Sequence, residues 1–259
     1  IDEINTLRKI KQFSKISNPI PDITNRNWIY EIKKINDYNK LQKMNALPNW
    51  YNIKINNIYK KITNEELQIY KNKKNIYYLK LYNCEKISDV SALSNCYDLT
   101  LSWCKNILDI SSLGNCKNLT LECCFNISDV GTLKNCKNLY IDMCDNILDV
   151  SALSNCKKIT LLNCNKISDI SALGNCHKIE LCYCNNISDV SALGNCNNLI
   201  LDNCKKILDV SALGNCKNLT LRSCDDVLDF SVLSSCKKLT LIWCNDLSDV
   251  SVFSNCKNL

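Results

Sequence analysis

The chain has 259 residues, of which 46% are hydrophobic, and this is enough for a continuous core. No run of about 18 apolar residues occurs, so the sequence predicts no membrane span. Residues 1–75 contain 15 Lys or Arg and 7 Asp or Glu, a net charge of +8, whereas the whole chain carries +6 and the remainder therefore −2. A basic N-terminal part thus precedes a nearly neutral body.

Residues 1–52 have apolar residues at helical spacing, beginning with Ile29, Ile32 and Ile35. We interpret this segment as a helical cap that covers one end of the core that follows. A second interpretation is a diverged F-box, a motif that binds a ubiquitin-ligase adaptor. The resemblance is confined to residues 41–50, and the usual Leu-Pro start of the motif is absent.

Residues 53–78 predict one irregular structural repeat. An Ile-x-Ile pair that begins at Ile53 lies 26 residues before a Leu-x-Leu pair that begins at Leu79. Such alternation is typical of a short strand with one buried face. Thr63 and Glu66 have the spacing of a capping box, which would open a helix between the two strands.

Residues 79–259 repeat a unit of 20 residues nine times without an insertion. Counted from Leu81, the unit reads L-x-x-C-x-x-I-x-D-V-S-A-L-x-N-C-x-x-L-x. One unit is too short to bury its own apolar positions, so the units must stack and share one core. The Leu-x-Leu pairs then form a parallel sheet, and the short D-V-S-A-L segment suits a 3₁₀ turn.

One Asp occurs at the same place in every unit, where the predicted turn begins. Its carboxylate can accept the free N–H groups that open the turn. We therefore interpret the column as part of the scaffold rather than as nine catalytic carboxylates. It consists of Asp89, Asp109, Asp129, Asp149, Asp169, Asp189, Asp209, Asp229 and Asp249.

The stretch L-x-L-x-x-C-x-x-I-x-D resembles the cysteine-containing leucine-rich repeat, and D-V-S-A-L resembles the turn of internalin-like repeats. The unit ISDVSALGNC is similar to repeat proteins of mimivirus-type giant viruses. The resemblance covers residues 79–259 and implies an α/β leucine-rich-repeat solenoid with a parallel concave sheet and short convex turns. It also implies that a partner binds the concave side, in the cytoplasm of a host cell.

All 20 cysteines lie in the repeats, and 18 of them form two columns that the pattern turns inward. We predict buried free thiols in a reducing cytosol, because a fold with its own core needs no disulfide framework. A disulfide ladder between strands about 4.8 Å apart is the alternative, but parallel side chains disfavour its torsion. The columns offer no set of four convergent ligands, so we expect neither a metal nor another cofactor.

The sequence favours binding over catalysis, and we predict no catalytic residues. The only histidine, His177, stands where other units have Lys, and no Gly-rich phosphate loop is present. A row of lysines before the strands could attract nucleic acid, but lysines more often cover the rim of a core, and we do not favour nucleic-acid binding. An uncovered last repeat would expose core and a strand edge, so we expect self-association through the C-terminal end.

Three positions in each predicted strand vary from unit to unit, and we expect them to face outward from the concave sheet. They hold large and charged side chains, and exposed aromatic residues are typical of binding hot spots. The alternatives are neutral drift on a scaffold or decoy without a ligand, and a ubiquitination adaptor that uses the F-box. The predicted contacts to a protein partner are Trp103, Glu122, Tyr140, Asp142, Met143, Tyr183, Asp202, Arg222 and Trp243.

Overall fold

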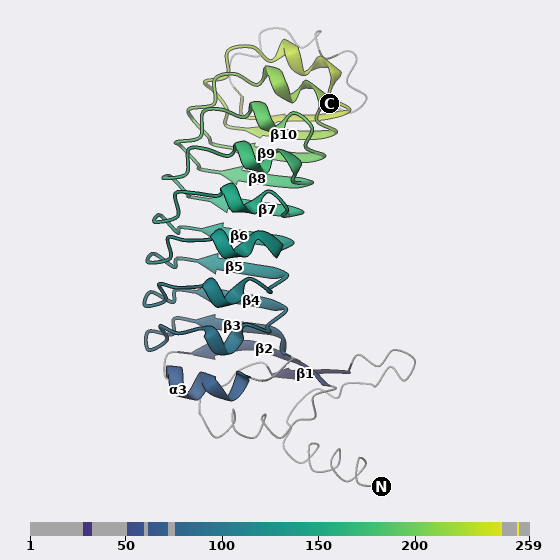
Figure 1. Cartoon of the computed structure of the whole chain (residues 1–259). Helices are drawn as coiled ribbons and strands as arrows, with labels where there is room; N and C mark the ends of the chain where they lie inside the picture. The colour runs from purple at the N-terminus through teal and green to yellow at the C-terminus, as the bar shows by residue number, and fades with distance from the viewer. Residues whose placement is uncertain (1–27, 33–50, 60–61, 72–75, 245–252, 254–259) are drawn as a thin grey trace.

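The computed structural model describes residues 28–32, 51–59, 62–71, 76–244 and 253. In these ranges eleven strands form one parallel sheet, and their order in the sheet is their order in the chain. Figure 1 shows the strands stacked in a single elongated column, with the short turns stacked in a second row beside them. Each unit contacts its neighbours in sequence, as the 20-residue repeat predicts.

The strands are short and evenly placed. From Tyr78 onward each strand residue pairs with the residue 20 positions later in the next strand, for example Leu119 with Leu139. The strands are β1 (Trp28–Ile32), β2 (Tyr51–Tyr59), β3 (Ile76–Tyr82), β4 (Asp98–Ser102), β5 (Asn118–Glu122), β6 (Asn138–Asp142), β7 (Lys158–Leu162), β8 (Lys178–Cys182), β9 (Asn198–Asp202), β10 (Asn218–Arg222) and β11 (Lys238–Ile242).

Each regular unit returns through one 3₁₀ turn, as the short D-V-S-A-L segment predicts. The predicted Asp caps are confirmed from Asp89 to Asp229: Asp89 Oδ1, for example, accepts the Ser91 N–H at 2.7 Å. Asp249 lies outside the described residues. The turns are η2 (Ser91–Leu93), η3 (Ser111–Leu113), η4 (Gly131–Asn135), η5 (Ser151–Leu153), η6 (Ser171–Asn175), η7 (Ser191–Leu193), η8 (Ser211–Asn215) and η9 (Ser231–Ser235).

The core lies between the sheet and the turns and consists of columns of Leu, Ile, Val and Cys. The described cysteines are free, and all but Cys244 are buried, so the prediction of buried free thiols is confirmed for them. Their thiols donate to carbonyl oxygens of the preceding unit, as from Cys124 Sγ to Leu101 O at 3.4 Å. Burial raises the pKa of the Cys116 thiol to about 12.

The N-terminal strands correct part of the sequence interpretation. Ile29 and Ile32, whose spacing predicted a helix, lie in strand β1, which pairs in parallel with β2. Backbone pairing with a strand 23 positions later, Trp28 with Tyr51, overrides the local pattern. Apart from β1 and the start of β2, the predicted cap and F-box lie outside the described residues.

The irregular repeat contains the predicted capping box. Thr63 Oγ1 accepts the Glu66 N–H, and Glu66 Oε2 accepts the Thr63 N–H at 3.0 Å. This box opens the short helix α3 (Asn64–Leu67), which continues into the 3₁₀ turn η1 (Gln68–Tyr70). Within the described part of the chain, no helix has the length and apolar character to cross a membrane.

Candidate recognition surface

Alternation along each strand separates a core face from an outer face, which we call the open face. In β6, Leu139 and Ile141 are buried, whereas Tyr140 and Asp142 between and after them are half-buried and point outward. The open face therefore displays the two outer positions of each strand, the columns that begin with Lys80 and Tyr82. Both are among the columns that we expected to face outward.

The third expected column does not lie in the strands. Its nine members follow the strand ends and have left-handed backbones, with φ from 46° at Ser223 to 57° at Trp103. The N–H of Trp103 donates to Glu122 O at 2.8 Å, so these residues still connect neighbouring units. We call them the rim column: Asn83, Trp103, Cys123, Met143, Asn163, Tyr183, Asn203, Ser223 and Trp243.

Large side chains of the rim column are exposed. The exposed fraction is 41% for Trp103, 43% for Met143 and 47% for Tyr183, whereas Cys123 between the first two is only 5% exposed. The Trp103 ring meets Phe125 edge to face at 6.2 Å between centroids. The rim is therefore a row of apolar side chains separated by smaller residues.

Carboxylates line the open face next to the rim. We call Glu122, Asp142, Glu180 and Asp202 the acidic strip. Tyr140 lies among them: its pKa is raised to about 12, mainly by burial and then by Asp142, Glu122 and Glu180. Asp202 has a weak ion pair with Arg222, with 3.8 Å between its Oδ2 and the guanidinium Nη1.

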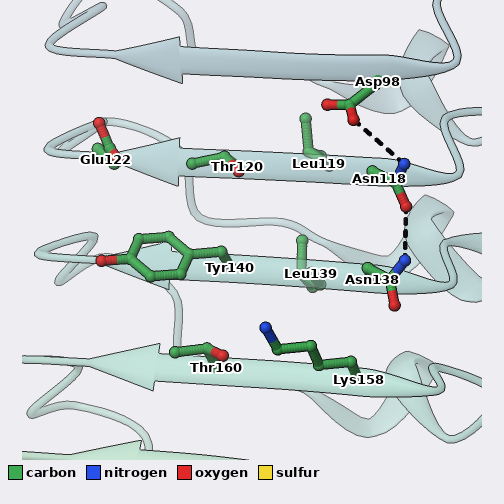
Figure 2. A pocket seen from close by; sticks show the side chains of 10 residues that line it. All are labelled: Asp98, Asn118, Leu119, Thr120, Glu122, Asn138, Leu139, Tyr140, Lys158 and Thr160. Atoms are coloured by element: carbon green, nitrogen blue, oxygen red, sulfur yellow. Dashed lines mark hydrogen bonds between the residues drawn. The ribbon is translucent and has the colours of Figure 1, made fainter.

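A shallow pocket of about 310 Å³ crosses the open face from β4 to β7. Figure 2 shows Glu122 and Tyr140 toward the ends of their strands, and Asn118, Asn138 and Lys158 at the opposite end. Asn138 Nδ2 donates to Asn118 Oδ1 at 2.6 Å, and Asn118 Nδ2 donates to Asp98 Oδ2 at 3.2 Å. These amides join neighbouring strands and form one wall of the pocket.

The sequence interpretation missed this amide wall. Asp98, Asn118, Asn138 and Lys158 stand at the first position of each strand, which we did not count among the outward columns. The sequence indicated that this position faces outward only through its change between Asp, Asn and Lys from unit to unit.

Several residues of the outward columns are buried, which corrects the expectation that these columns are exposed. Ser102 and Thr160 are buried polar residues, and Cys182 is buried as well. Thr160 pairs in register with Tyr140 on one side and Glu180 on the other, so two longer side chains flank a short one. Outward direction and exposure are separate properties on a sheet with strands about 4.8 Å apart.

The arrangement offers charges, amides and rings for binding. Among the described residues, no three His, Cys, Asp or Glu side chains are grouped to hold a metal ion. His177, which stands where other units have Lys, is exposed and lies directly before β8.

No model of a known protein family matches the sequence, and no curated protein matches it. Solved structures do. An internalin, InlF from Listeria monocytogenes, is 24% identical and has a TM-score of 0.65, and the match covers 89% of this chain and 71% of that chain. With the strand order, the constant register and the 3₁₀ turns, this match shows a leucine-rich-repeat solenoid.

Two other matches have lower structural similarity. The functional domain of InlJ from Listeria monocytogenes, which is said to include a cysteine ladder, is 18% identical with a TM-score of 0.41; the match covers 74% of this chain and 53% of that one. The leucine-rich-repeat domain of the type III effector XopL is 14% identical with a TM-score of 0.44, over 68% of this chain and 79% of that one.

Proposed function

We propose that this solenoid is a non-enzymatic recognition module that binds a protein partner on its open face, through the rim column and the acidic strip. The observation that carries the proposal is the exposure of Trp103, Met143 and Tyr183 at positions with a left-handed backbone. Neither the core nor the backbone accounts for large apolar residues there.

The backbone of the rim column favours other residues. A left-handed conformation costs an L-residue about 1–2 kcal/mol, and Asn adopts it more readily than most. Asn occupies the position in three units, at Asn83, Asn163 and Asn203. Exposed aromatic and Met side chains in a row are typical of the contacts that dominate protein interfaces.

The compartment is also a proposal. The resemblance to giant-virus repeats implies the cytoplasm of an infected host cell, and the free thiols of the described residues support a reducing compartment. Adaptor function through an F-box would depend on residues outside the described ranges.

Affinity capture from amoebal host lysate, with mass spectrometry, tests the proposal. The rim variant is Trp103→Asn/Met143→Asn/Tyr183→Asn. A matched control removes three other exposed apolar side chains, which lie before the 3₁₀ turns, in Leu108→Ser/Leu148→Ser/Leu228→Ser. Circular dichroism and a thermal melt establish that each variant folds.

We expect one partner that the wild type and the control both retain and the rim variant loses. The same proteins in all three lanes, or none, would favour a scaffold without a specific ligand and would overturn the proposal.

A further inference from the structure

We infer that the open face takes an extended, cationic segment of another polypeptide, whose ammonium or guanidinium groups meet the acidic strip while its apolar side chains meet the rim column. This inference rests on the proposed function and names the chemistry of the partner.

The charge of the open face is concentrated in its middle. The two outer positions of strands β5 to β9 contain the four carboxylates of the acidic strip and no Lys or Arg. Lys158 and Lys178 begin β7 and β8, and each lies four residues before the end of its strand, about 13 Å along a strand. That distance exceeds the screening length of about 8 Å at physiological ionic strength, so these lysines do little to neutralise Glu122, Asp142 and Asp202 at the strand ends. Glu180 is in the middle of β8, two residues or about 7 Å from Lys178, and is partly compensated.

Few positively charged side chains of the protein itself compensate the negative charge of the acidic strip. Among the described residues, no Lys or Arg forms an ion pair with Glu122, Asp142 or Glu180. Asp142 Oδ1 accepts one hydrogen bond from Asn163 Nδ2 at 2.9 Å. The phenol of Tyr140 lies among these carboxylates, which help to raise its pKa. A cation at this place would therefore meet several carboxylates at once.

The spacing of the rim fits an extended chain. Trp103, Met143 and Tyr183 occupy alternate units, so they stand two strand spacings apart, about 9.6 Å. An extended chain in the polyproline II conformation has three residues per turn and advances about 3.1 Å per residue, so every third side chain returns to the same face after about 9.3 Å. Cys123 and Asn163 lie between the large side chains and leave room for an apolar residue of the partner.

The attraction of a cationic segment is a property of the acidic strip and not of the molecule as a whole. The whole chain carries +6, so its overall charge repels a cationic ligand rather than attracting it. Binding of a basic segment must therefore depend on the acidic strip itself.

Fluorescence polarisation with the full chain tests the inference. The probe is a labelled 12-residue peptide with Leu at every third position and Arg at the others, compared with an isomer in which the four Leu are grouped at one end. The strip variant is Glu122→Gln/Asp142→Asn/Glu180→Gln. The matched control, Glu85→Gln/Asp225→Asn/Asp226→Asn, removes three carboxylates in the turns after β3 and β10.

We expect the strip variant to bind the spaced peptide at least about tenfold more weakly than the wild type, and the control to stay within about twofold. The grouped isomer should bind several-fold more weakly than the spaced one. Equal losses of affinity in the two variants, or no binding by the wild type, would overturn the inference. Equal binding of the two peptide isomers would overturn the proposed three-residue spacing of apolar side chains in the ligand. The capture experiment above uses the rim variant, so it can succeed while this one fails.

Discussion

The framework and the rim of each repeat come from the same 20-residue unit, but different forces constrain them. Framework positions such as Leu161 and Cys164 are buried, and they hardly change between units. Rim positions share one backbone conformation, yet their residues range from Asn163 to Trp103. Uniformity therefore reports internal packing, whereas variety at a position with a restricted backbone is what the proposed recognition of a partner would produce.

The largest expected effect is a loss of stability of the framework at alkaline pH. Burial raises the pKa of Cys116 and Cys156 to about 12 and that of Cys136 to about 11, against an ordinary value of 9.0. Below pH 9 both states keep the protons; above it the unfolded chain releases them and the folded chain does not, so stability falls. We expect the Tm to drop steeply between pH 9 and pH 11, measured under reducing conditions; a constant Tm would contradict the role of the thiols.

A core truncation in a central unit should have the next largest effect. Leu161→Ala removes a fully buried side chain from β7 and should lower the free energy of unfolding by about 2–5 kcal/mol. Urea denaturation followed by circular dichroism measures it, with Thr120→Ala on the open face as the control. A loss below about 1 kcal/mol would show that the stack relaxes around the cavity.

The Asp caps should contribute a smaller part of the stability of the fold, and this part should be sensitive to acid. The Ser151 N–H donates a hydrogen bond to the Asp149 carboxylate and holds its pKa below the ordinary value of 3.8. The pKa values of Asp109 and Asp169 are lowered in the same way. This stability is present above pH 4 and is lost as the pH falls through the lowered pKa. We expect Asp149→Ala to lower the Tm at pH 7 but much less at pH 2.5, whereas Asp145→Ala, in the turn before, should change neither.

At the rim, one substitution should strengthen the fold and weaken recognition. Met143→Asn places a residue suited to the left-handed backbone at an exposed site, so we expect a gain of about 1 kcal/mol in unfolding free energy. The same variant should bind the spaced peptide more weakly than the wild type. A loss of stability would mean that the contact of Met143 with Cys123, 3.8 Å between sulfur atoms, outweighs the backbone strain.

The smallest effect should come from an exposed residue outside both regions. Leu228 is 83% exposed, and four of the other units have Ser at its position within the described residues. Leu228→Ser should therefore change the unfolding free energy by less than about 0.5 kcal/mol and leave peptide binding unchanged. A larger change in either measurement would reveal a second functional surface.

Most of the repeat architecture could be predicted, because nine copies display the buried columns directly. The parallel strands, the 3₁₀ turns, the Asp caps and the buried thiols all follow from positions that do not change. The left-handed rim could not be predicted in this way, since the pattern does not show where a strand ends. The three Asn residues of the rim column were the only indication.

Other features depend on partners distant in sequence. The short side chain of Thr160 is buried by what the neighbouring units carry, and a single unit does not contain that information. Strand β1 exists because β2 offers it a paired edge, while the local spacing of Ile29 and Ile32 fits a helix equally well. Non-local pairing decides such short segments.

The constant register has an evolutionary consequence. Because pairing between β3 and β11 repeats every 20 residues without an insertion, the gain or loss of one whole unit leaves every other strand junction in the same geometry. In-frame recombination between copies could therefore lengthen or shorten the molecule by about 4.8 Å per event. The length of the surface, and with it the size of the proposed ligand, could be inherited as a copy number rather than as a set of point substitutions.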